Sequence, residues 1–78
     1  MQEYTLLRRV KGTERAESWT LIVPPSGEVY VEYEHFWDNP VRAGRESENR
    51  FHPLSEFLAI GEPAVCTRLL EVLQQLGL

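Results

Sequence analysis

A few side chains in this 78-residue chain could support acid–base chemistry, and they lie in or near residues 28–37, EVYVEYEHFW. Glu34 and His35 are adjacent in a segment that alternates like a strand, so their side chains point to opposite faces and cannot act on one substrate atom. Glu32 and Glu34 share a face, where their carboxylates are expected roughly 7 Å apart, a separation that suits paired hydrolytic acids. Such a pair needs a cleft, and a small sheet offers little concavity. We therefore predict no catalytic residues and no enzyme activity.

Metal and nucleophile chemistry have equally little support. His35 and His52 lack the close spacing of compact zinc sites, and Cys66 supplies no second thiolate. Cys66 lies on the apolar side of a predicted helix, where a cysteine usually acts as a small hydrophobic residue. No phosphate-binding loop, dinucleotide fingerprint or nucleophile elbow occurs in the sequence. The sequence therefore predicts no metal site and no cofactor.

The alternation in residues 28–37 instead predicts a strand with two different faces. One face is apolar and aromatic and is expected to face the core; it carries Val29, Val31, Tyr33, His35 and Trp37. The other combines carboxylates with aromatic rings. We call it the acidic face, and it consists of Glu28, Tyr30, Glu32, Glu34, Phe36 and Asp38. Acids beside aromatic rings can form an interaction surface, so these six residues are the predicted partner-binding site.

Two further strands are predicted before this one. Residues 3–10, EYTLLRRV, are rich in strand formers and end at the polar turn KGTER, and residues 17–23, ESWTLIV, follow that turn. Trp19 must share a face with Val29 and Val31, which requires an odd number of loop residues between the second and third strands. A three-residue loop, Pro24, Pro25 and Ser26, places Leu21 opposite Val29.

After the third strand, residues 38–50 contain few apolar side chains, a proline, a glycine and mixed charges. This composition predicts one long loop, of a length that is often either functional or disordered.

The last third of the chain is predicted to be helical. Pro53 opens a helix of about two turns that ends at Gly61, and Pro63 opens a longer helix that ends at Gly77. The longer helix carries an apolar stripe formed by Val65, Leu69, Val72, Leu73 and Leu76. The predicted fold is α+β: a three-stranded antiparallel meander followed by a short helix and a longer helix, both packed on one face of the sheet. Trp19 is expected on that inner face, near Leu69 and Leu73.

Length and composition bound what the protein can be. Residues 1–78 suffice for one small globular domain. The single cysteine favours a reducing compartment, and no apolar run reaches the length of a signal peptide or a membrane span, so we expect a soluble cytoplasmic protein. The net charge of −4 disfavours a phosphate backbone as the main partner.

Three functions are compatible with these features. The favoured one is a non-enzymatic protein–protein interaction module, such as an inhibitor, an antagonist or an adaptor, whose acidic face binds a basic protein surface. The first alternative is a homodimeric structural protein, because small domains often gain stability by association and a meander leaves open edges. The second is weak binding of single-stranded nucleic acid by the first strand and by Arg42, Arg45, Arg50 and Phe51.

Overall fold

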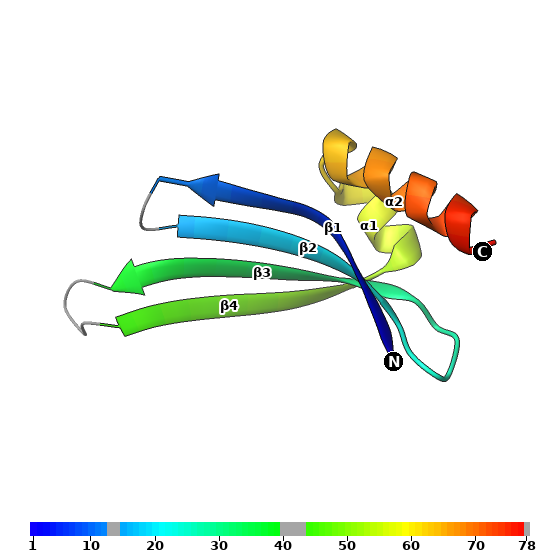
Figure 1. The fold of residues 1–78 in the computed structure, drawn as a ribbon, viewed down its shortest axis with the longest axis horizontal. Helices are drawn as coiled ribbons and strands as arrows, with labels where there is room; N and C mark the ends of the chain where they lie inside the picture. Colours follow the sequence, from blue (N-terminus) through cyan, green and yellow to red (C-terminus); the bar gives the residue numbers. More distant parts are fainter. Residues whose placement is uncertain (13–14, 40–43, 78) are drawn as a thin grey trace.

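In the computed structural model the chain forms one four-stranded antiparallel sheet followed by two helices (Figure 1). The structure describes residues 1–12, 15–39 and 44–77. The strands run in sheet order as they do in sequence, and the elements are β1 (Gln2–Lys11), β2 (Arg15–Val23), β3 (Tyr30–Asn39), β4 (Gly44–Pro53), α1 (Leu54–Ile60) and α2 (Pro63–Leu76). The predicted α+β class, the meander and the two terminal helices are confirmed.

The predicted number of strands is wrong, because β4 occupies much of the segment expected to be a loop. Within residues 38–50, β3 continues to Asn39 and β4 starts at Gly44; residues 40–43 lie outside the described part of the chain. The sequence of β4 is poor in strand formers, and it is an edge strand paired with β3 along its whole length. Pairing with a neighbour overrides weak intrinsic propensity, and a polar sequence protects an exposed edge from unwanted pairing.

The alternation predicted for β2 and β3 is confirmed, but the predicted pairing is shifted. Leu21 lies opposite Val31, two residues beyond the expected Val29, because the connection is longer than the three residues proposed. A shift by two residues preserves the faces, since side chains alternate with a period of two. Trp19 consequently lies opposite Tyr33 on the inner face.

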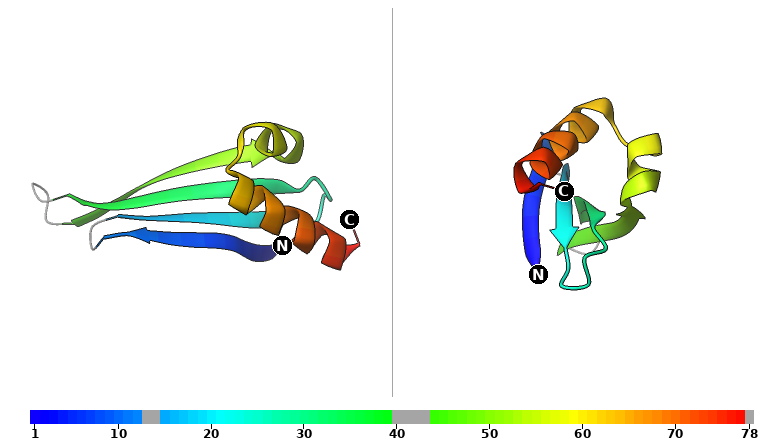
Figure 2. Two further views of the ribbon diagram at one scale, coloured as in Figure 1. Left: turned by 90° about the horizontal axis from the view of Figure 1, so that it is seen from above. Right: turned by 90° about the vertical axis from the view of Figure 1, so that its right-hand side faces the viewer.

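Both helices pack on this inner face, at the end of the sheet where β1 begins and β4 ends (Figures 1 and 2). Pro63 occupies the first turn of α2, and Gly77 ends the helix with a left-handed backbone, φ 74°, as the sequence predicted. Four of the five predicted stripe residues are buried; Leu76 is exposed at the end of the helix. The core face of α2 therefore comes from Val65, Leu69, Val72 and Leu73.

The hydrophobic core lies between the helices and this end of the sheet. Trp19 is only 5% exposed and belongs to the same buried cluster as Leu69 and Leu73, which confirms its predicted place. Leu6 joins the cluster from β1, where the pairing with β2 is irregular between Thr5 and Leu7. The full buried cluster is Leu6, Trp19, Leu21, Val31, Phe57, Val65, Leu69, Val72 and Leu73.

The other end of the sheet extends beyond the helices, which do not cover it (Figure 2). This extension makes the molecule elongated, with principal dimensions of 45 × 25 × 19 Å. Along the inner side of the extension the rings of β3 follow one another: Tyr33 and His35 are stacked with ring centroids 6.5 Å apart, and His35 and Trp37 are tilted with ring centroids 5.3 Å apart. No helix among the described residues has the length and apolarity needed to cross a membrane.

Candidate functional site

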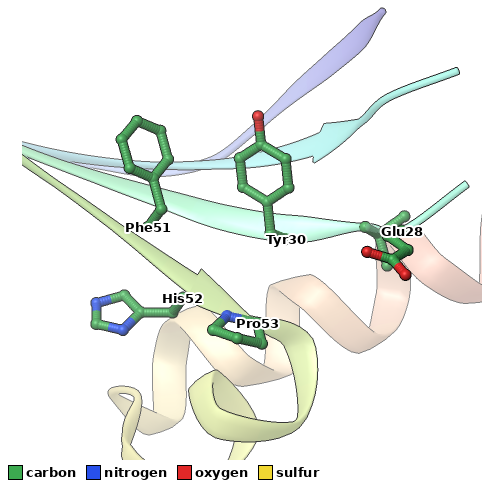
Figure 3. Close-up of a pocket in the computed structure, with 6 residues that line it drawn as sticks. Glu28, Tyr30, Phe51, His52 and Pro53 are labelled. Carbon is green, nitrogen blue, oxygen red and sulfur yellow. The ribbon is translucent and has the colours of Figure 1, made fainter. Parts of the chain in front are cut away.

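The sheet face turned away from the helices carries the acidic face predicted from the sequence, and the structure adds a further aromatic ring, that of Phe51, to it. Tyr30, at the start of β3, forms an edge-to-face pair with Phe51 of β4, with ring centroids 5.8 Å apart. Figure 3 shows both rings pointing away from the helices. Phe51 is 60% exposed, although burial usually stabilises so large an apolar side chain. The pair therefore forms an aromatic surface in which Phe51 is exposed and Tyr30 is half-buried.

A shallow hollow of about 280 Å³ lies beside the two rings (Figure 3). Its lining comes from the end of the β2–β3 connection and from the paired ends of β3 and β4: Glu28, Val29, Tyr30, Phe51, His52 and Pro53. The hollow thus combines aromatic walls with a carboxylate at its margin. Its size suits a single side chain of a partner better than a whole small-molecule substrate, because ligand pockets usually occupy roughly 300–1,000 Å³.

The acidic face also has a buried aliphatic residue of its own. Ile22 pairs with Tyr30 across β2 and β3, so it shares the face of Tyr30 and not that of the helix-side cluster. It is nonetheless only 1% exposed. This end of the acidic face therefore includes a buried apolar side chain on the strand next to Tyr30.

Glu32 and Glu34 form the charged part of the site. Burial raises the pKa of Glu32, and the neighbouring Glu34 raises it further through a shared hydrogen bond and its negative charge. Asn49 of β4 opposes this shift, because its Nδ2 donates a hydrogen bond to Glu32 Oε1 over 3.0 Å. Two carboxylates held this close repel each other when both are ionised, and a cation placed between them would relieve that repulsion.

The six predicted residues share a face but do not form one compact site. Tyr30, Glu32 and Glu34 gather with Phe51 near the helical end of the sheet, and Glu28 precedes the strand at the margin of the hollow. Phe36 lies six residues farther along the strand than Tyr30, roughly 20 Å at the usual rise per residue. Phe36 and Asp38 also have interactions within the molecule. The candidate site is therefore limited to one end of the acidic face. It consists of Glu28, Tyr30, Glu32, Glu34 and Phe51.

Sequence reasoning missed Phe51 and Asn49 as members of this face because it placed residues up to 50 in a loop and Phe51 at its end. Asn49 and Phe51 are separated by one residue, so in a strand their side chains would share a face, with Arg50 and His52 on the other. In the structure Phe51 lies opposite Glu32 and Asn49 lies opposite Glu34, which completes the face from the neighbouring strand.

The other chemistry-bearing residues are dispersed. His35 lies on the inner face between Tyr33, on which its ring stacks, and Trp37, against which its ring is tilted, and it points away from the face of Glu34. His52 Nδ1 lies 3.3 Å from Glu56 Oε1 at the entrance to α1, and Cys66 Sγ lies 3.8 Å from the carbonyl oxygen of Phe57. Within residues 1–12, 15–39 and 44–77, no three potential metal-binding side chains are grouped closely enough to hold an ion.

No protein-family model, curated protein or solved structure matches this chain. The function is therefore inferred from the arrangement of its own residues.

Proposed function

We propose that this protein is a non-enzymatic interaction module that binds a basic surface of another protein with the helical end of its acidic face. Such a module could act as an inhibitor, an antagonist or an adaptor. The proposal depends on one observation above all: an aromatic pair, half-buried Tyr30 and exposed Phe51, lies beside two neighbouring carboxylates, Glu32 and Glu34.

The two halves of this surface have complementary roles in binding. Aromatic rings supply large contact areas with little conformational freedom to lose, and they are enriched among the residues that dominate binding energy. The carboxylates add specificity, because opposite charges steer association while like charges on a wrong partner are repelled. Burial is the main reason that the pKa of Glu32 is raised, and the charge of Glu34 adds to it; an arginine or lysine of the partner placed beside Glu32 would relieve that added repulsion.

Affinity capture from the native host, repeated with matched variants, tests the proposal. Phe51→Ala and Glu34→Lys should each abolish capture of a partner with a basic surface. Leu70→Ala and Glu71→Lys, which change an exposed leucine and an exposed glutamate on α2, should leave capture unchanged. The proposal would be abandoned if the partner stayed bound to both acidic-face variants.

The homodimer remains an alternative proposal, since β1 and β4 each have a neighbour on one side only. The like charges of Glu32 and Glu34 disfavour stacking of two acidic faces, so an edge or a helix would form the contact. A sedimentation measurement that shows a monomer at high micromolar concentration would remove this alternative.

The second alternative, binding of single-stranded nucleic acid, has less support. Arg50 lies opposite Tyr33 and Phe51 lies opposite Glu32, so these two predicted contacts point to opposite faces of β4. Arg42 and the side chain of Arg45 lie outside the described residues. Phe51 moreover lies among carboxylates that would repel a phosphate backbone. Passage through a polyanion column at low salt without retention would discard this alternative.

A further inference from the structure

β4 leaves one edge of the sheet open (Figures 1 and 2). Its pairing with β3 runs from Gly44 to Pro53 without an irregularity. An edge strand presents unpaired backbone N–H and C=O groups on its free side, and these groups can accept a further strand. A regular edge is a better template than a bulged one, because a bulge disrupts the row of hydrogen-bonding groups. The free side of β4 is therefore an uninterrupted hydrogen-bonding edge.

The other edge strand, β1, is less suited to such pairing. Its register with β2 is irregular between Thr5 and Leu7, and α2 contacts this strand. The charged residues that β1 carries on the inner face are Arg9 and Lys11, which are both positive. Two copies of β1 would therefore bring no opposite charges together on that face.

The charged residues of β4 on the inner face follow an order that suits pairing with a second copy of the same strand. Along the strand they are two acids followed by two basic residues: Glu46, Glu48, Arg50 and His52. An antiparallel neighbour reverses this order, so acids lie opposite basic residues. In the register that sets Asn49 opposite Asn49 of the second copy, Glu48 of each copy faces Arg50 of the other. Glu46 then faces His52.

The two nearest registers that keep the faces are less favourable. A shift by two residues in one direction places Glu48 opposite Glu48, and a shift in the other direction places Arg50 opposite Arg50. Like charges directly opposite each other destabilise a pair of strands. The charge order of β4 therefore selects one register, and it also disfavours pairing with strands of unrelated charge order.

Glu48 and Arg50 have the exposure and the bonding capacity for these contacts. Their side chains are 51% and 63% exposed. Within one molecule Arg50 Nη2 donates a hydrogen bond to Glu48 Oε1 over 3.1 Å. A guanidinium has five N–H donors and a carboxylate has two oxygens, so this single bond leaves donors and an acceptor for the second copy. Glu46 has an interaction within the molecule, so the central pair of Glu48 and Arg50 provides the complementarity.

We propose that two copies of this chain associate through the edges of β4, antiparallel about Asn49, and join their two sheets into one. Backbone hydrogen bonds between the edges supply affinity, and the pairs of Glu48 with Arg50 supply the choice of partner and register. Small domains often gain stability from such association. The acidic faces of both copies stay on the outer side of the joined sheet, so this dimer does not depend on the partner binding proposed above.

Sedimentation equilibrium of charge-reversed variants tests the interface. The wild type should dimerise at high micromolar concentration. Glu48→Arg and Arg50→Glu each turn two opposite-charge pairs into like-charge pairs, and each should weaken dimerisation about tenfold or more. The double variant, which carries both changes, restores opposite charges and should dimerise like the wild type. Arg8→Glu reverses an exposed arginine on β1 and should leave dimerisation unchanged.

A mixture of the two single variants separates loss of charge complementarity from loss of folding. In a mixed dimer the new arginine of Glu48→Arg faces the new glutamate of Arg50→Glu, and the unchanged Arg50 and Glu48 face each other. An equimolar mixture should therefore dimerise at a concentration where neither variant does so alone. Undiminished dimerisation of both single variants, a mixture that stays monomeric, or a wild type that is monomeric at high micromolar concentration would overturn the proposal.

Discussion

Trp19 is the residue that connects the core of this protein with its inner surface. It is buried in the cluster beneath the helices, it contacts the ring of Tyr33, and it carries the guanidinium of Arg9 on its ring. The residues of β2 and β3 that share this face could be predicted from the sequence because strand alternation is strict, and an error of two residues in pairing does not alter the faces.

Replacement of Trp19 by alanine should lower the free energy of unfolding by about 3–5 kcal/mol, because it removes a large buried side chain and leaves a cavity. That is a large fraction of the stability of so small a domain. Phe36→Ala, at a half-buried residue on the acidic face, should cost well under half as much. Thermal melts of both variants compare their stabilities, and a larger loss of stability for Phe36→Ala than for Trp19→Ala would contradict the assignment of the faces.

Glu32 should make stability depend on pH in a definite direction. Its pKa is raised above 4.5 in the folded protein, so the folded state binds this proton more tightly than the unfolded state does. The resulting cost is present at neutral pH and disappears as pH falls through the raised pKa and below 4.5. Glu32→Gln should therefore be more stable than the wild type at neutral pH, with the difference closing on acidification. Urea unfolding across a pH series measures this difference; a gap that widened in acid would be inconsistent with a raised pKa.

Among the elements, β4 shows where prediction from the sequence reaches its limit. Its residues include serine, asparagine, glycine and several charged side chains, which have weak strand propensity, and its place is fixed by pairing with β3. The two helices could be predicted because proline and glycine mark their ends and an apolar stripe marks their packing. The missed strand matters for the proposed site, since it contributes Phe51 to the acidic face.

The end of α1 depends on a close contact that only glycine permits. The backbone N–H of Gly61 donates a hydrogen bond to the carbonyl oxygen of Phe57, and an added Cβ would lie 2.7 Å from that oxygen and 2.9 Å from the ring. Gly61→Ala should therefore lower the free energy of unfolding by about 1–3 kcal/mol, the usual cost of overpacking.

Chemical denaturation of this variant provides the measurement. Ala59→Ser, an exposed change on the same helix, serves as the control and should remain within about 0.5 kcal/mol of the wild type. Equal stability of Gly61→Ala and the control would show that α1 can end in another way.

At the scale of the whole molecule, the helices bury one end of an elongated sheet and leave the rest of both sheet faces available for contact (Figure 2). The two faces differ in chemistry. The acidic face combines half-buried Tyr30 and exposed Phe51 with repelling carboxylates, and the inner face carries buried Glu17 beside the rings of Trp19 and Tyr33. The acidic face is the surface proposed to contact positively charged groups, in agreement with the net charge of −4.

The most direct test of the central claim is NMR shift mapping of the protein with the partner obtained by affinity capture. The account predicts that the largest changes in backbone amide signals cluster around Tyr30, Glu32 and Phe51, with little change along α2, because the acidic face is the proposed contact surface. Changes concentrated on α2, or along the inner face of the sheet with the signals of Tyr30 and Phe51 unmoved, would contradict it.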